Sequence, residues 1–324
     1  MAINSRVYRD NSLTTEKVDF TNIHNLSNDK HALFWFDLLN PTRTEIDQLG
    51  EAIGFDSFHL DDAFDGRQRP KLDVLTDYLF INTYTANFDE TTQRLATSEV
   101  AIFVTKNGLI TVRTDADAEI QHIQRRWDET AKGRKISIDF LLWGALDVIV
   151  DGYFDALDYL DDGIENLEEV MLSEKTTSRP DQRTTYDLRK SLVLLRRTTL
   201  PMREIIGPLI RQDVIPISQE MALHYHDVYD HVIRVADWTE SLRDLISTLI
   251  ETNLTIQSNR MNLVMKKVTS WAAIIAVPTA ITGFYGQNIP YPGFGDESGF
   301  WVSTAAIVVI SGALYATFKR RDWL

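Results

Sequence analysis

The stretches VTSWAAIIAVPTAITGFYGQNIPYPGFG (268–295) and GFWVSTAAIVVISGALYATF (299–318) decide how this sequence is read, because neither contains a charged residue. A helix needs about 20 mostly apolar residues to cross a bilayer. Each stretch is long enough, and only a short connection separates them. The sequence therefore predicts two membrane-spanning helices near its C-terminus, with buried helices of a soluble core as the alternative.

The charges around these stretches predict an orientation. Lys266 and Lys267 precede the first stretch, a basic group follows the second at 319–321, and the connection carries only Asp296 and Glu297. Basic residues concentrate on the cytoplasmic side of a membrane. We therefore expect a multi-pass protein with both termini in the cytoplasm and a short outer loop.

The composition of the whole chain narrows the partners. The 324 residues carry a net charge of −14, which argues against nucleic acid as a partner, and the chain contains no cysteine. A bound metal would have to be held by oxygen atoms or by one of seven histidines. Cations are the more natural partners of such a chain.

The N-terminal part, residues 1–135, predicts a cytoplasmic α/β domain. Short β-rich runs alternate with helical segments such as TRTEIDQLGEAIG, which opens at Thr42 after Pro41. Lys106-Asn107-Gly108 separates two apolar runs and is a strong hairpin signal. The sheet of this domain is thus expected to contain antiparallel strands.

The remaining chain is predicted to be helical. Residues 136–217 are expected to form cytoplasmic helices, and 218–267 a stalk helix that continues into the first membrane helix, 268–288. The helix is expected to be continuous because, counting from residue 218, the first proline is Pro278 and the first glycine is Gly283. An outer loop (289–298), a second membrane helix (299–318) and a basic tail (319–324) follow. A helix from 218 to 285 is on the order of 100 Å long. Two spans enclose no pore, so a channel requires an oligomer.

An acidic stripe marks the segment 137–170, which contains no lysine or arginine. Carboxylates recur every three or four residues, at Asp147, Asp151, Asp155, Asp158, Asp162 and Glu165. The following helix is basic, from Arg189 to Arg203. Two paired or solvated helix faces explain this pattern, and a cation-accumulating surface is the alternative.

The first membrane helix has one face of small, polar and flexible residues. At spacings of three or four they are Asn262, Met265, Val268, Ala272, Ala276, Thr279 and Gly283. Small residues allow close helix contacts in membranes, and a pore lining has the same appearance. The second span has no comparable stripe and is predicted to face lipid.

The outer end of this helix carries Gly286, Gln287 and Asn288 before a proline-rich exit. Mg²⁺ gives up its water reluctantly, so a filter can recognise the hydrated ion through amide oxygens that accept hydrogen bonds from bound water. A ring of Asn288 side chains could do this. Gly and Asn are also ordinary residues at helix ends, so a simple cap remains the alternative.

Several segments together resemble the CorA family of magnesium and divalent metal ion transporters. They are Tyr285-Gly286-Gln287-Asn288 preceded by Val277-Pro278-Thr279, the ending Phe318-Lys319-Arg320-Arg321-Asp322-Trp323-Leu324, and, further back, the segments 226–231, 258–262, 188–192 and 200–203. The similarity covers residues 140–324 well and the α/β domain in general order. One departure is Gln287, where the family signature Gly-Met-Asn has methionine.

The resemblance implies a funnel-shaped homopentamer in a bacterial-type plasma (inner) membrane, with a stalk helix that becomes the inner pore helix. It implies that Gly286, Gln287 and Asn288 form the selectivity filter and that the seven-residue stripe lines the pore. Asp227 matches a family position where intracellular magnesium binds between subunits, and Asp89 is the candidate partner carboxylate. Divalent cations, membrane lipids and further copies of the chain are the expected partners. The resemblance implies Mg²⁺ as the transported ion, a regulatory role for the same ion as a further expectation, and no organic cofactor.

The function expected from these observations is passive influx of hydrated Mg²⁺, gated by cytoplasmic metal, with Asp296 and Glu297 attracting cations to the entrance. Gln287 keeps open a transporter of Zn²⁺, Co²⁺ or Ni²⁺, including a proton-coupled one. A non-conducting membrane sensor or scaffold is the alternative of another class. The sequence contains no phosphate-binding loop and no visible pairing of nucleophile and base, so an enzyme is not expected.

Overall fold

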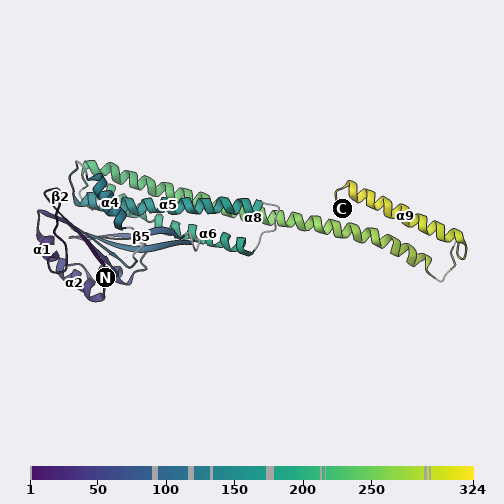
Figure 1. The fold of residues 1–324 in the computed structure, drawn as a ribbon, viewed down its shortest axis with the longest axis horizontal. Helices are drawn as coiled ribbons and strands as arrows, with labels where there is room; N and C mark the ends of the chain where they lie inside the picture. Colours follow the sequence, from purple (N-terminus) through teal and green to yellow (C-terminus); the bar gives the residue numbers. More distant parts are fainter. Residues whose placement is uncertain are drawn as a thin grey trace. The chain divides into compact units, whose positions relative to one another are not determined.

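The computed structural model describes residues 2–89, 94–115, 120–131, 134–172, 179–211, 214–215, 217–287, 290–291 and 293–324. The chain divides into two compact units, Met1–Ser247 and Thr248–Leu324. The first holds the sheet, the helices between residues 23 and 210 and the start of the long helix that begins at Gln219 (Figure 1). The second holds the rest of that helix and the apolar helix that begins at Glu297. We call the first the cytoplasmic unit, after the location that its sequence predicts, and the second the apolar unit.

Within the described residues, the cytoplasmic unit contains a seven-stranded sheet in the order β2-β1-β3-β7-β6-β5-β4. The strands are β1 (Ala2–Arg9), β2 (Ser12–Leu13), β3 (Ala32–Leu39), β4 (Lys71–Val74), β5 (Leu79–Asp89), β6 (Arg94–Val104) and β7 (Gly108–Arg113). Strands β3 and β7 are parallel and the other neighbours are antiparallel. The predicted hairpin at 106–108 is confirmed, because β6 and β7 pair and the Thr105 N–H donates to the Gly108 carbonyl at 2.8 Å.

Successive side chains of β3 point to opposite faces of the sheet, and both faces are packed. Phe34, Phe36 and Leu38 belong to a core shared with α2 (Arg43–Ile53) and α3 (Ser57–Asp65). Trp35 points the other way and meets Trp127 of α4 (Ile120–Thr130) edge to face, with ring centroids 5.2 Å apart. The sheet is therefore covered on both sides, as an α/β domain requires.

Local sequence explains the start of α2. Thr42 and Glu45 form a capping box, in which each side chain satisfies a backbone N–H of the other. The helix ends at Gly54, whose φ of 89° favours glycine. The helix that the sequence predicts to open at Thr42 is thus confirmed.

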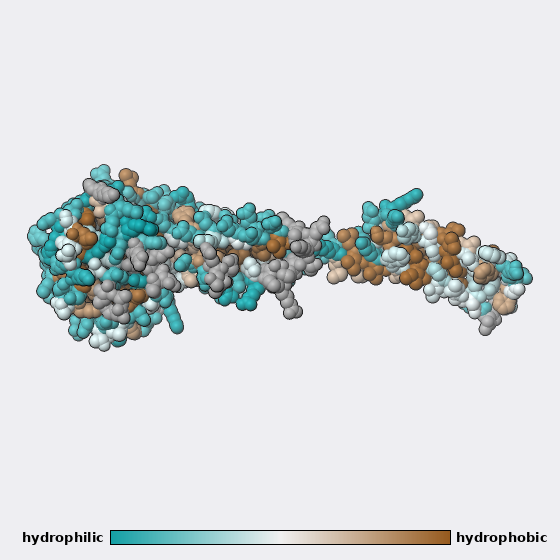
Figure 2. Space-filling model, viewed as in Figure 1, coloured by the Kyte–Doolittle hydropathy of each residue, from teal (hydrophilic) through white to brown (hydrophobic). Residues whose placement is uncertain are grey.

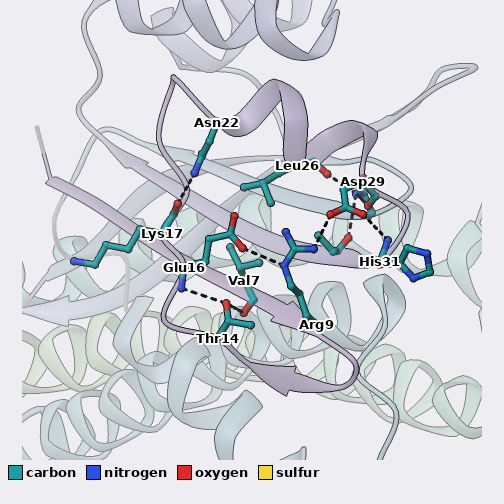
Figure 3. A network of polar contacts seen from close by, with 11 residues as sticks. Val7, Arg9, Thr14, Glu16, Lys17, Asn22, Leu26, Asp29 and His31 are labelled. Atoms are coloured by element: carbon teal, nitrogen blue, oxygen red, sulfur yellow. Dashed lines mark hydrogen bonds and ion pairs between the residues drawn. The ribbon is translucent and has the colours of Figure 1, made fainter.

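A polar network closes the outer edge of the sheet around α1 (Ile23–Asn28) (Figure 3). Arg9 reaches Glu16 at 3.1 Å and Asp29 at 2.6 Å, and the His31 N–H donates to Asp29 at 2.9 Å. Thr14 donates to the Val7 carbonyl at 3.0 Å. These bonds satisfy polar groups of an edge and fix the loop that follows β2.

The other helices are α5 (Ile138–Leu172), α6 (Arg179–Thr199), α7 (Met202–Ile210), α8 (Gln219–Tyr285) and α9 (Glu297–Arg320). The 67 residues of α8 confirm the predicted continuous helix. Its first part packs within the cytoplasmic unit, where the Tyr225 hydroxyl donates to the Asp139 carbonyl of α5 at 2.9 Å. Val228, Val232 and Val235 on the same face are fully buried.

The apolar unit contains the rest of α8 and α9, and brown residues gather on this pair of helices in Figure 2. Both helices are long and apolar enough to cross a membrane, and only 6% of each apolar window is buried. A core helix of a soluble domain would be mostly buried instead. The low burial favours membrane-spanning helices over the soluble alternative.

Candidate ion pathway

The membrane part of α8 has one half-buried face. Ala273, Ile274, Val277, Pro278 and Ile281 are half-buried, at spacings that keep them on one side of the helix. Helix α9 is the other long element of the apolar unit, and it returns far enough for Trp323, beyond its end, to meet Lys266. We therefore assign this face of α8 to contact with α9.

The predicted pore stripe lies on the other side of α8. All of its members are exposed in the single chain: Asn262, Met265, Val268, Ala272, Ala276, Thr279 and Gly283. A helix turns about 100° per residue, so Ala276 and Gly283 point away from Ile274 and Ile281. Packing against the chain's own α9 therefore does not explain this stripe, which leaves it free for the pore lining that the sequence predicts.

The chemistry of the stripe suits an ion that keeps its water. Thr279 donates its hydroxyl to the Ile275 carbonyl at 3.0 Å, so the side chain is held along the helix with its oxygen lone pairs available. A Cβ added at Gly283 would meet no atom within 4 Å, so the helix surface is open there. The stripe contains no histidine, cysteine or carboxylate, the ligands that zinc prefers. Such a surface can pass a hydrated cation without stripping it.

Helix α8 ends at the predicted filter. The Gly286 N–H donates to the Thr282 carbonyl at 2.8 Å, and the Gln287 N–H donates to Phe284 at 3.3 Å. A Cβ at Gly286 would lie 2.9 Å from the Thr282 oxygen, which explains a glycine at this helix end. Gly286 and Gln287 are exposed, and Asn288 lies outside the described residues.

The sequence reasoning missed one contact at this exit. Tyr291 donates its hydroxyl to the Tyr285 carbonyl at 3.0 Å, and the two rings meet nearly perpendicularly at 4.9 Å. The Tyr285 carbonyl is among the last four of the helix, which lack partners within it. Tyr291 therefore closes the turn that carries Gly286 and Gln287. The Pro290-Tyr291-Pro292 pattern was the available signal.

The predicted outer acidic pair starts α9. Asp296 is the residue before the helix and Glu297 lies in its first turn, and both are exposed. Negative charge stabilises a helix N-terminus by about 0.3–1 kcal/mol. This structural role coexists with the predicted attraction of cations.

The predicted regulatory carboxylates are both exposed and come from different elements. Asp227 lies on α8 with its side chain 66% exposed, 3.7 Å from Nε2 of His231, and Asp89 ends β5. Among the described residues of one chain, no group of three or more histidine, cysteine or acidic side chains could hold a metal ion. A metal site at either residue therefore needs water or ligands from another copy.

Two members of the acidic stripe find a partner on α4. Arg126 pairs with Asp147 at 2.6 Å and also with Asp151. Arg196 of the basic helix α6 pairs with Glu240 of α8. Burial raises the pKa of Asp147 to about 6, against the opposing effect of Arg126. Charge pairing thus explains this end of the stripe.

Comparisons with known proteins identify a family and similar chains. The family model described as CorA-like Mg²⁺ transporter protein matches residues 30–320. The chain is 34% identical over 298 residues to the cobalt/magnesium transport protein CorA of Thermotoga maritima, covering 90% of this chain and 83% of the relative. It is 27% identical to the protein of the same name from Methanocaldococcus jannaschii, covering 98% of both. The complete structure of the CorA magnesium transporter from the latter organism matches all of both chains, with a TM-score of 0.83 and 26% identity.

Proposed function

Because the chain belongs to the CorA-like Mg²⁺ transporter family, we propose that it is one subunit of a divalent cation channel that admits hydrated Mg²⁺ to the cell. This family consists of transporters and not of enzymes. The observation that carries the proposal is the position of the stripe. Small and polar residues of α8 lie opposite the half-buried face that we assign to α9, where they can surround an axis shared by several copies.

The assembly that fits is a homopentamer with α8 inside and α9 outside. Large apolar side chains remain exposed on both helices of the single chain, including Ile275 at 63% and Val309 at 68%. Lipid would cover the outward faces, and the α8 helices of several copies would surround the shared axis. The basic flanks support an orientation with both termini on the cytoplasmic side of a bacterial-type inner membrane and with Asp296 and Glu297 outside.

The membrane potential is sufficient to drive the ion inward. A doubly charged ion gains about 4.6 kcal/mol per 100 mV, twice the value for a single charge. Passive flow therefore needs no coupled hydrolysis of a nucleotide. The acidic outer loop would raise the local cation concentration.

Closure would occur at the inner end of the stripe, under control of cytoplasmic Mg²⁺. Met265 and Val268 are apolar, and a ring of such side chains can block ions by excluding water. Mg²⁺ bound at Asp227, with Asp89 from a neighbouring copy, would hold subunits together in the closed arrangement. The exposure of both carboxylates supports a site shared between copies.

Gln287 favours one alternative within the same class. A different residue in the middle of the filter signature changes the packing around Asn288 and with it the choice of ion. A transporter of Zn²⁺, Co²⁺ or Ni²⁺, including a proton-coupled one, remains consistent with the stripe, since a hydrated ion needs no special ligands.

The test is ion flux into liposomes that contain the purified protein at a fixed voltage, comparing Mg²⁺ with Zn²⁺, Co²⁺ and Ni²⁺. We expect Mg²⁺ to enter, to be blocked by cobalt hexaammine as an inert mimic of the hydrated ion, and to be lost in Asn288→Ala. The matched control is Asn166→Ala, an exposed asparagine of α5.

Other outcomes would replace the proposal. Preferential entry of Zn²⁺ that follows a proton gradient would assign the chain to the alternative, and Gln287→Met would then be expected to restore Mg²⁺ preference. Absence of any flux in an intact oligomer would support a non-conducting sensor.

A further inference from the structure

A pocket lies on the flank of α8 where the helix enters the apolar unit. Its volume is about 520 Å³, and its lining residues are Asn259, Asn262, Leu263, Met265, Lys266, Thr269 and Trp323. All of them belong to the unit Thr248–Leu324. The lining combines one cation and two amides with apolar side chains, which suits a ligand that is anionic at one end and apolar at the other.

The C-terminal tail forms one wall of the pocket through a defined helix cap. The Trp323 N–H donates to the Phe318 carbonyl at 3.0 Å, and the Trp323 ring stacks on Phe318 at 5.7 Å. Asp322 between them has a φ of 54°, as a Schellman motif requires. The Nζ of Lys266 lies 6.0 Å from the centre of the Trp323 ring. The tail is thus folded back onto α8.

The basic residues around the pocket carry charge that this part of the chain does not neutralise. Among the described residues, the structure gives no ion pair to the basic cluster Lys266, Lys267, Lys319, Arg320 and Arg321, although Asp322 adjoins it in the sequence. The contacts that the structure gives them are with rings, of Trp323 for Lys266 and of Tyr315 for Lys319. In a chain with a net charge of −14, five unneutralised cations indicate an external anion.

The position of the pocket identifies the anion's source. Lys266 immediately precedes the charge-free stretch that begins at Val268, so the pocket lies at the level of the cytoplasmic headgroups in the proposed orientation. Basic pockets between membrane helices on that side bind lipid headgroups, and tryptophan concentrates at the same level.

We propose that this pocket binds the phosphate headgroup of an anionic phospholipid of the inner leaflet. Lys266 pairs with the phosphate, and the amides of Asn259 and Asn262 donate hydrogen bonds to it. Leu263, Met265 and Trp323 provide apolar surface for the start of the acyl chains. The inference rests on the proposed membrane orientation and not on ion conduction.

The pocket also adjoins the predicted pore lining. Asn262 and Met265 belong to both, because the pocket occupies the sector of α8 between the face toward α9 and the stripe. A bound lipid would therefore contact the segment where closure is proposed.

The test uses the purified full-length oligomer in detergent, titrated with short-chain phosphatidylglycerol and, separately, phosphatidylcholine, with bound lipid counted by native mass spectrometry. We expect saturable binding of phosphatidylglycerol only. Lys266→Gln should weaken it about tenfold, because a charge-assisted contact in a partly enclosed site is lost. Lys267→Gln is the matched control, since its neighbouring charge does not line the pocket, and it should change binding less than about twofold.

Four outcomes would overturn the inference. Equal losses in the two lysine variants would show diffuse attraction to the whole basic cluster. Equal binding of phosphatidylcholine would show that charge is not recognised, and displacement by millimolar inorganic phosphate would identify a free anion as the ligand. Absence of saturable binding would indicate that a neighbouring subunit fills the pocket. Lipid counting needs no ion flux, so the channel proposal and the lipid site can fail separately.

Discussion

The two units of this chain bury their apolar residues to very different extents. In the cytoplasmic unit Phe34, Phe36 and Phe103 are completely buried, whereas in the apolar unit Met261 and Trp301 are 63% and 66% exposed. The first unit buries its own apolar side chains, in cores on both faces of its sheet. In the proposed assembly the second is covered by lipid and by other copies of the chain, so its structure and its function would both depend on assembly.

The largest expected effect is on the free energy of unfolding of the cytoplasmic unit. Arg113 and Asp37 form a buried ion pair at 3.0 Å, so Arg113→Ala leaves the Asp37 carboxylate buried without its partner. We expect a loss of about 3–5 kcal/mol in the free energy of unfolding. Urea unfolding of the solubilised chain, followed by tryptophan fluorescence, measures it.

Arg43 provides the control for this change. It pairs with Asp47 and Asp61 while about half exposed, so Arg43→Ala should cost at most about 1 kcal/mol. Equal losses of unfolding free energy in the two variants would mean that burial does not determine how much these ion pairs contribute to stability.

The second prediction concerns the membrane insertion of the apolar unit. Val309 on α9 is 68% exposed, so Val309→Arg places a charge where lipid is expected. The cost of membrane insertion should rise by about 3–4 kcal/mol, and the fraction of protein that resists alkaline extraction from membranes should fall. Val74→Arg, at a 54% exposed valine of the cytoplasmic unit, should leave extraction unchanged. If both variants remain fully integrated, α9 does not face lipid at Val309.

The third prediction concerns pH and the cytoplasmic unit. The pKa of Asp147 is raised to about 6 by burial, so between about pH 4 and 6 the folded state binds more protons at this group than the unfolded state. Stability contributed by this group is therefore present at low pH and lost as pH rises through 6. Asp147→Asn should remove that loss, roughly 2–3 kcal/mol, when unfolding is measured at pH 4.5 and 7.5.

Asp158, an exposed member of the same stripe, is the control for the pH effect. Unfolding of Asp158→Asn at the same two pH values separates an effect of position 147 from the effect of removing any carboxylate of the stripe. A wild-type profile that is flat between pH 4 and 6 would contradict the assignment of the raised pKa to Asp147.

The fourth and smallest effect tests whether the two units communicate. If Mg²⁺ binds at Asp227 and favours closure, Asp227→Asn should raise the internal Mg²⁺ concentration that halves liposome flux by about fivefold, the low end of typical coupling between sites. Asp230→Asn changes another exposed carboxylate of the same helix and should leave that concentration unchanged. Identical responses would remove Asp227 from regulation.

The elements of the apolar unit could be predicted because they depend on local composition. Two charge-free runs, and the absence of glycine and proline before Pro278, were enough to predict α8 and α9. The capping box at Thr42 and the hairpin at Asn107 are equally local signals.

Other features depend on residues far apart in sequence, and periodicity contains no information about them. Arg126 pairs with the acidic stripe from α4, and Trp323 folds back to Lys266. The stripe on α8 could be proposed from the spacing of small residues alone. The half-burial of Ile274 and Ile281 was needed to show which face of the helix lies on the opposite side from the stripe.

The most direct test of the central claim uses the absence of cysteine from the chain. Ala276→Cys places a thiol on the proposed pore face, and Ala273→Cys makes the same change on the face toward α9. A water-soluble cationic thiol reagent should modify the cysteine at 276 and block Mg²⁺ flux into liposomes, while flux through the 273 variant continues. Equal block of both variants, or block of the 273 variant alone, would contradict the assignment of this face of α8 to the pore.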